Sequence, residues 1–265
     1  MEWEREEARR RYRMCRVGFS FISLGIGLLF INSVVFLAWF FSNRPEGIRS
    51  LIESSWWEWA VGAPITLGTL IGAYLLWGRS SDPAWQRQAG VLVLLNFVDF
   101  LTWSLRHADE FGLKISTLGH EWLIHNITEA NGWVEYLLFA SLAVEVAQRL
   151  GKSDAPEAGM GARSLSSIGL VFWAITFVSL TDWTHGWPLK SVAIRPREFV
   201  LIHLGSMVIS TIAAFQVTFL TVTASRYCTR ALAEMDKEDR GDELLRSASE
   251  AFSNDPRDWF SDGDP

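Results

Sequence analysis

The sequence predicts an all-α, polytopic membrane protein, a bundle of about six transmembrane helices. Long runs without charge alternate with short charged segments along the 265 residues, of which 49% are hydrophobic. Several runs reach the roughly 20 residues that a helix needs to cross the bilayer. The chain also has 14 tryptophans, many of them at the ends of these runs, where interfacial anchoring places such side chains.

The first three predicted spans differ in polarity. The first, 17–41, contains no charged residue. The second, 59–78, carries Pro64 and several small residues, which suit close helix packing in a membrane. The third, 89–105, contains Asp99, and a charged group within a bilayer usually faces the bundle interior or a cavity.

The last three predicted spans are 121–147, 165–183 and 199–224. The first of these is the most polar of all six. The other two are long apolar runs with few polar interruptions. Together the six spans form a predicted membrane domain over 17–225.

The charged segments predict the orientation. An even number of spans places both ends of the chain on one side of the membrane. The segments on the amino-terminal side contain 17 of the 24 Lys and Arg residues, so the positive-inside rule predicts that both termini are cytoplasmic. A basic segment, 1–16, precedes the membrane domain, and an acidic tail, 226–265, follows it and is expected to be partly disordered. The patterns of nucleotide-binding and kinase proteins do not occur, and no nucleic acid partner is expected.

Five histidines form the main chemical feature of the sequence. His107 follows the third span, His120 and His125 open the fourth, His185 follows the fifth, and His203 is early in the sixth. All five lie in or beside the predicted outer half of the membrane domain. A single histidine near the headgroups is most often only an interfacial polar residue. Five on one face are better explained by a shared metal site.

Acidic residues accompany the histidines. Glu121, His125 and Glu129 are spaced four apart and therefore share one helical face, which Glu135 roughly continues. Asp182 precedes the fourth histidine by three positions. Imidazole together with carboxylate is a ligand set for Zn, Cu, Fe or Ni, so these residues predict a transition-metal site.

Several motifs resemble those of the third subunit of the copper-containing membrane monooxygenases, which oxidise methane, ammonia or short alkanes. The stretch "GAYLLWGRSSDPAWQRQ" is similar to the family's exit from the second span. His107 and His120 are separated by twelve residues, as in the family motif Asp-x3-His-x12-His. The stretch "TDWTH", which ends at His185, is similar to a second motif, Asn-Glu-Trp-x-His. His203 is similar to the histidine that follows it early in the last span.

The chain departs from the family pattern at several positions. Trp103 stands where the first motif has its Asp, and Thr181 stands where the second has its Asn. Counted back from the cytoplasmic end of the fourth span, His125 rather than His120 falls opposite the family's histidine. Asp99 is a candidate replacement for the missing acid, although it lies two helical turns away from His107.

The resemblance implies a copper-dependent monooxygenase. One copper would be held by Asp182, His185 and His203, and a second by His107 with either His120 or His125. The remaining acids on the histidine face would orient ligands or relay protons rather than bind copper directly; these are Glu121, Glu129 and Glu135.

The resemblance also implies the setting. The chain would be one of three subunits in a protomer, with three protomers forming a trimer in the lipid of a bacterial inner membrane. The complex would use O2, with quinol as the reductant, to hydroxylate methane, ammonia or a short alkane. Two other functions are compatible with the residues: a zinc-dependent intramembrane hydrolase, and a non-catalytic subunit that stabilises a membrane complex.

Overall fold

The structure is a computed structural model that describes most of the chain. The described residues are 2–42, 46, 50, 54–78, 82–107, 121–152, 155–180 and 196–253. For 2, 55, 121–125, 155, 156, 158, 178–180, 196–203 and 246–253, the description is of the backbone alone. All regular secondary structure in these parts is helical.

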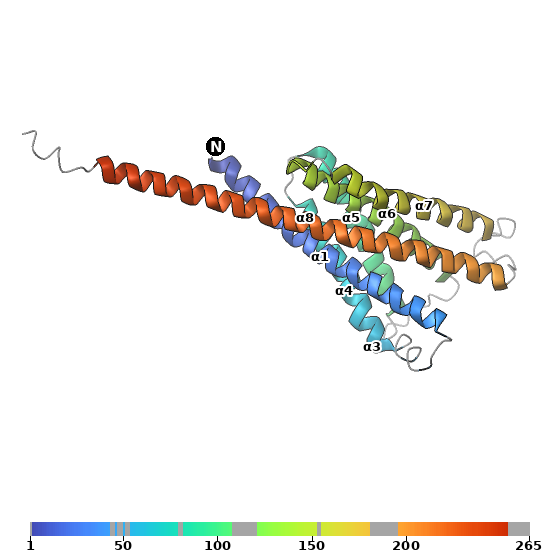
Figure 1. Ribbon diagram of the computed structural model, residues 1–265. Helices are drawn as coiled ribbons and strands as arrows, with labels where there is room; N and C mark the ends of the chain where they lie inside the picture. The colour runs from blue at the N-terminus through green and yellow to red at the C-terminus, as the bar shows by residue number, and fades with distance from the viewer. Residues whose placement is uncertain are drawn as a thin grey trace, which may run out of the picture.

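The chain forms long helices connected in sequence (Figure 1). The first is α1 (Glu2–Phe41). A short helix α3 (Ser55–Trp57), a π-helical turn η1 (Glu58–Gly62) and α4 (Ala63–Trp77) together form the second. The others are α5 (Pro83–Arg106), α6 (Glu121–Arg149), α7 (Ala155–Leu180) and α8 (Pro196–Ser253).

The predicted class, an all-α polytopic membrane protein, is confirmed. Within the described residues, five helical stretches are long and apolar enough to cross a membrane: Trp3–Phe41, Glu58–Trp77, Pro83–Arg106, Gly159–Phe177 and Leu204–Leu245. The fourth predicted span, 121–147, is a helix of sufficient length, α6, but it is too polar to qualify by hydropathy.

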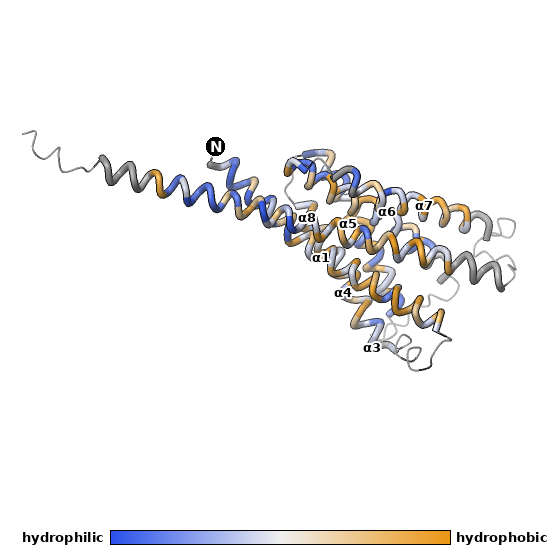
Figure 2. The backbone as a smooth tube through the Cα atoms, in the orientation of Figure 1, coloured by the Kyte–Doolittle hydropathy of each residue, from blue (hydrophilic) through white to orange (hydrophobic). Residues whose placement is uncertain are grey.

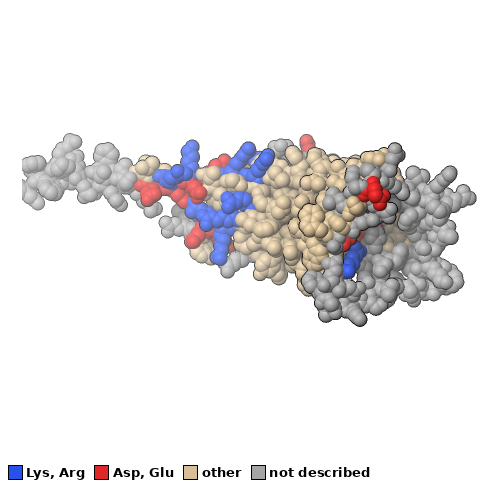
Figure 3. Space-filling view, turned by 90° about the horizontal axis from the view of Figure 1, so that it is seen from below, with Lys and Arg blue, Asp and Glu red and all other residues tan. Residues whose placement is uncertain are grey.

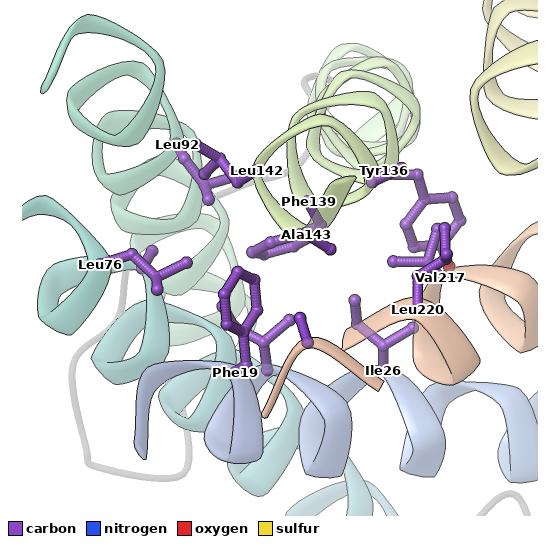
Figure 4. Packing of buried hydrophobic residues seen from close by; sticks show 14 of the residues in the cluster. Phe19, Ile26, Leu76, Leu92, Tyr136, Phe139, Leu142, Ala143, Val217 and Leu220 are labelled. Carbon is purple, nitrogen blue, oxygen red and sulfur yellow. The ribbon is translucent and has the colours of Figure 1, made fainter. Parts of the chain in front are cut away.

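The position of α6 explains its polarity. It packs against α5, α7 and α8, so much of its surface faces protein rather than lipid. Figure 4 shows Tyr136, Phe139, Leu142 and Ala143 of α6 pointing toward side chains of the surrounding helices. Because polar groups are tolerated in a membrane when they face the bundle interior, a central helix does not need the hydropathy of a lipid-facing one.

The apolar core joins α6 to the other helices. Phe19 and Phe139 are fully buried, and they come from α1 and α6. Leu76 of α4, Leu92 of α5 and Val217 of α8 belong to the same cluster (Figure 4). This cluster fixes the relative positions of the helices that carry the polar groups of the bundle.

The start of α1 lies beside the second half of α8. The start of α1 and the far part of α8 run antiparallel and extend beyond the bundle (Figure 1), joined by ion pairs from Arg5 and Arg9 to acidic residues of α8. Both helices change from apolar to polar along their length in this region (Figure 2). Charged side chains gather at this end, whereas most of the bundle surface seen from below is uncharged (Figure 3).

Helices α5 and α6 are antiparallel with a regular register. Near one end, Arg149 of α6 forms an ion pair with Asp82, and further along Asn131 of α6 donates a hydrogen bond to Asp99 of α5 at 3.1 Å. The steps from Asp82 to Asp99 and from Arg149 back to Asn131 are nearly equal in length. Continuing that register beyond Asp99 toward His107 leads back to the first two turns of α6, which contain His125.

Candidate functional site

His107 ends α5 and is buried, with 7% of its surface exposed. Its ring packs in one cluster with two tryptophans. The Trp103 ring is tilted against it at a centroid distance of 4.7 Å, and the Trp59 ring meets it edge-on at 5.4 Å. The two tryptophans also contact each other at 4.8 Å. The three rings therefore form a compact aromatic cluster, which restricts the orientation of the imidazole.

A π-helical turn brings the opposite wall of this site into place. The turn, Glu58–Gly62, supplies Trp59 and Glu58, and such turns are frequent at functional sites. Trp57 anchors the turn to α1 by a 2.9 Å hydrogen bond from its Nε1 to Oδ1 of Asn32. Gly62 is required beside α5, because a Cβ there would lie 2.9 Å from Nε1 of Trp103.

The hydrogen bonds of His107 assign roles to its two ring nitrogens. Nδ1 lies 2.9 Å from the backbone carbonyl oxygen of Trp103. A carbonyl oxygen can only accept, so Nδ1 must carry the proton in this contact. Nε2 lies 3.3 Å from Oε2 of Glu58. Nε2 therefore meets a carboxylate oxygen, while the other ring nitrogen, Nδ1, is already protonated.

The contact between Nε2 and Glu58 is compatible with two arrangements. In one, Nε2 also carries a proton and donates it to the carboxylate. In the other, Nε2 is unprotonated and has a free lone pair, and Nε2 and the Glu58 oxygen are both ligands of one cation. Two ligands at about 2.0–2.1 Å from an ion with tetrahedral angles lie about 3.3–3.4 Å apart, which matches the observed 3.3 Å.

The other predicted ligands are only partly placed by the structure. His120, Asp182 and His185 lie outside the described residues. His125 is in the second turn of α6 and His203 in the third turn of α8, and of these two only the backbone is described. Among the side chains that the structure does describe, no three His, Cys, Asp or Glu groups lie close enough together to hold a metal ion. The described part of the candidate site is the pair His107 and Glu58.

A second polar group lies deeper in the bundle, between α5 and α6. Asp99 accepts the hydrogen bond from Asn131, and its charge acts on Glu135, one turn further along α6. Glu135 is 7% exposed, and its Oε1 has no hydrogen-bond partner within the described parts of the chain. By the register of the two helices, the buried Asn96 lies at the same level as Glu135.

The predicted line of acids on α6 is divided between two neighbouring helices. Glu129 accepts a 2.8 Å hydrogen bond from Ser206 of α8, whereas Glu135 interacts with Asp99 of α5. Positions 129 and 135 are six residues apart, and each residue adds about 100° around the helix axis. Their side chains therefore project from different faces of α6. The side chains of Glu121 and His125 lie outside the described part of this face.

Sequence reasoning did not single out Glu58 or Asn131. Glu58 lies 49 positions before His107 and belongs to a segment that resembles an ordinary loop end. Asn131 is uncharged, and only the packing of α5 on α6 shows that it faces Asp99. The one sequence signal for Glu58 was its place beside three tryptophans, Trp56, Trp57 and Trp59, at the start of a span.

The fold and these polar groups define an α-helical membrane protein with ionisable side chains inside its bundle. Comparison with known proteins adds one partial similarity: 88 residues are 32% identical to a stretch of the "Probable multidrug resistance protein NorM" of Rhodopseudomonas palustris. These residues are 33% of this chain and only 18% of that protein. No family model and no solved structure matches the chain.

Proposed function

We propose that this chain is a metal-binding membrane subunit of a copper-dependent monooxygenase complex. The observation that carries the proposal is the 3.3 Å approach of Nε2 of His107 to Oε2 of Glu58, with Nδ1 already committed to a carbonyl. Imidazole and carboxylate together are suitable copper ligands. The similarity of the histidine spacing to the monooxygenase motif supports the choice of metal.

Glu58 is a candidate for the acid that the motif lacks in sequence. Where the family pattern has an Asp, this chain has Trp103, whose side chain packs on the His107 ring instead. The carboxylate that meets His107 comes from the π-helical turn before α4. Asp99, the alternative considered from the sequence, accepts a hydrogen bond from Asn131, whereas Glu58 is the carboxylate that meets His107.

The third ligand of this site is proposed to be His125. The register of α5 and α6 leads from His107 to the turns of α6 that contain His125, which favours it over His120. A second site of Asp182, His185 and His203, implied by the motif similarity, remains part of the proposal. Copper, when bound, would supply the redox chemistry that couples reduction of O2 to hydroxylation of a small substrate.

The protein's own residues contribute orientation and protection. The carbonyl of Trp103 keeps the proton on Nδ1 and so leaves Nε2 available as a ligand, which is a common role for groups behind a metal-bound histidine. Trp59 and Trp103 pack against the ring of His107, a residue that is 7% exposed, and so shield part of the ring from water. An apolar substrate that dissolves in the bilayer reaches such a site at raised concentration.

The proposed complex contains two further subunits, takes two electrons and two protons from quinol, and works in a bacterial inner membrane with both ends of this chain cytoplasmic. One oxygen atom of O2 enters the substrate and the other leaves as water. The paired ends of α1 and α8 support the common side for both termini.

The test uses the complex purified from its native membrane. With ¹⁸O2 and a quinol, the wild-type complex should transfer ¹⁸O into methane, ammonia or a short alkane, and His107→Ala should lose most of that transfer. Glu145→Gln, which changes a carboxylate beside Arg149, is the matched control and should retain it. Absence of ¹⁸O transfer from every substrate class, or full transfer by His107→Ala, would reject the proposal.

Transport is a second candidate function, favoured by the partial similarity to NorM and by the buried acids between α5 and α6. Uptake of a labelled solute by liposomes that contain this chain alone, with neither O2 nor quinol, would distinguish transport from oxidation. A bound zinc ion without ¹⁸O transfer would instead favour the hydrolase.

A further inference from the structure

We propose that Asp99 and Glu135 form a proton-binding site between α5 and α6, in the interior of the bundle and separate from the candidate metal site. The ligand is a single proton taken from water. An O–H bond of a hydronium ion breaks and leaves water as an O–H bond forms on a carboxylate oxygen of Glu135; alkaline pH reverses the step, with hydroxide taking the proton. Two observations carry the inference: the placement of both acids between the packed helices α5 and α6, and an unpartnered buried oxygen on Glu135.

The first observation is the position of the pair. Asp99 is fixed by the 3.1 Å hydrogen bond from Asn131, and Glu135 is one helical turn beyond Asn131 on the same helix. By the register of the two helices, Glu135 lies level with Asn96 of α5, one turn from Asp99, and the charge of Asp99 acts on it. Two like charges in a medium of low dielectric constant repel strongly, which disfavours two ionised carboxylates here.

The second observation is Oε1 of Glu135. The residue is 7% exposed, and this oxygen lacks a hydrogen-bond partner among the described atoms. An ionised carboxylate buried with an unsatisfied oxygen is strongly unfavourable. A proton on Glu135 removes the charge and converts the side chain from an acceptor into a donor, which can then share its hydrogen with a neighbouring oxygen.

The surroundings contain little positive charge to stabilise the pair otherwise. The spans of α1, α4, α7 and α8 have no Lys or Arg in 17–41, 63–77, 164–177 and 204–225. Arg106 acts on Asp99 from two turns further along α5. On α6, Glu129 faces Ser206, and Tyr136 is hydrogen-bonded to Ser210 of α8. Asp99 is paired with Asn131, whereas Oε1 of Glu135 has no hydrogen-bond partner among the described atoms, so Glu135 is the group that takes the proton.

Intramembrane acids of this kind mark pathways for protons or ions. The register places the pair between the level of Asp82 and that of His107, so it lies inside the bundle rather than at either end. A site that takes and releases one proton there can couple proton movement to a change in helix packing. This role does not require a metal at His107.

The test is infrared spectroscopy of the full-length protein in lipid nanodiscs, in acidic and in alkaline buffer. Wild-type protein should show the C=O band of a protonated carboxylic acid that shifts in D2O and disappears at alkaline pH. Labelling glutamate with ¹³C at the side-chain carboxyl should move the band, which assigns it to Glu without any substitution. Glu135→Gln should abolish it, and the matched Glu145→Gln should leave it unchanged.

Asp99→Asn provides the second arm. Removing the neighbouring negative charge should leave the band in place but move its disappearance to a more acidic range, by about one pH unit or more. Unchanged helical circular dichroism would show that each variant is folded. The inference is overturned if the wild-type protein has no such band, if the band survives Glu135→Gln, if ¹³C-glutamate does not move it, or if Na⁺ but not K⁺ removes it.

Discussion

At the scale of single residues, glycines determine how closely α1 and α4 approach. A Cβ at Gly72 would lie 2.5 Å from Cγ1 of Ile22 and 2.7 Å from the carbonyl oxygen of Gly18. A Cβ at Gly18 would in turn lie 3.0 Å from the carbonyl oxygen of Gly72. Small residues that allow such backbone contact are a typical basis of helix association in membranes.

Gly72→Ala is therefore expected to destabilise the bundle. The added methyl group meets a backbone oxygen that cannot rotate away, and overpacking of this kind costs about 1–3 kcal/mol. The free energy of unfolding in detergent mixtures measures the effect.

Gly132→Ala is the matched control, because a Cβ at Gly132 would have no atom within 4 Å. It should be neutral, or more stable by up to about 1 kcal/mol from helix propensity. Equal losses in the two variants would contradict the proposed packing of α1 on α4.

Only some residues of the candidate site could be predicted from sequence. The sequence singled out His107 through its spacing and Glu135 because it roughly continues the helical face of the acids and histidine before it. From sequence, Trp103 was noted only because it stands where the family motif has an Asp. In the structure, its backbone carbonyl contacts Nδ1 of His107 and orients the ring. The contribution of Glu58 depends on how a π-helical turn packs against the end of α5, and no local pattern encodes that packing.

At the scale of helices, α5 begins with a polar cap that is also an interhelical contact. Asp82 accepts a 2.8 Å hydrogen bond from the backbone nitrogen of Ala84, and its other oxygen is paired with Arg149 of α6. The hydrogen bond from Ala84 and then the one from Arg149 lower the pKa of Asp82. The stabilisation they provide is complete above the unfolded-state pKa, about 3.9, and is lost as the pH falls through the lower folded-state value.

Two substitutions at Asp82 separate these contributions. Asn remains a good helix cap, so Asp82→Asn should lose only the interaction with Arg149, whereas Asp82→Ala should lose both. At neutral pH the melting temperature should fall in the order wild type, Asn, Ala. Because the carboxyl becomes protonated in acid, the difference between wild type and Asn should shrink there; a difference that does not depend on pH would count against the ion pair.

The helices themselves were largely predictable, and the reasons differ between them. Apolar runs located α1, α4, α5, α7 and α8, because each presents part of its surface to lipid. Because α6 is polar, its sequence indicates a membrane span less clearly than the other runs do. Its packing against three other helices explains why it is nevertheless a long helix. The exact starts could not be predicted: α7 begins at Ala155, ten positions before the predicted 165.

At the scale of the whole molecule, the paired ends of α1 and α8 form a charged extension of an otherwise apolar bundle. Arg9 is the less exposed of the two arginines, with 26% of its side chain accessible, and it binds Asp236 at 3.3 Å and also Asp239. Arg5 is 58% exposed and its ion pairs are longer than 3.3 Å.

We expect Arg9→Gln to loosen this extension more than Arg5→Gln does. Hydrogen exchange of amides in 230–245 should be faster in the Arg9 variant, and added salt should reduce the difference, since it screens exposed charges. Equal exchange in wild type and both variants would show that the ion pairs do not hold the two ends together.

The central claim is that His107 and Glu58 are ligands of one copper ion. The most direct measurement is the amount of copper per chain in the complex purified from its native membrane, for wild type, His107→Ala, Glu58→Gln and the Glu145→Gln control. We predict that copper is lost in His107→Ala, reduced in Glu58→Gln and unchanged in the control. The same copper content in all four proteins, or no copper in the wild type, would contradict the claim.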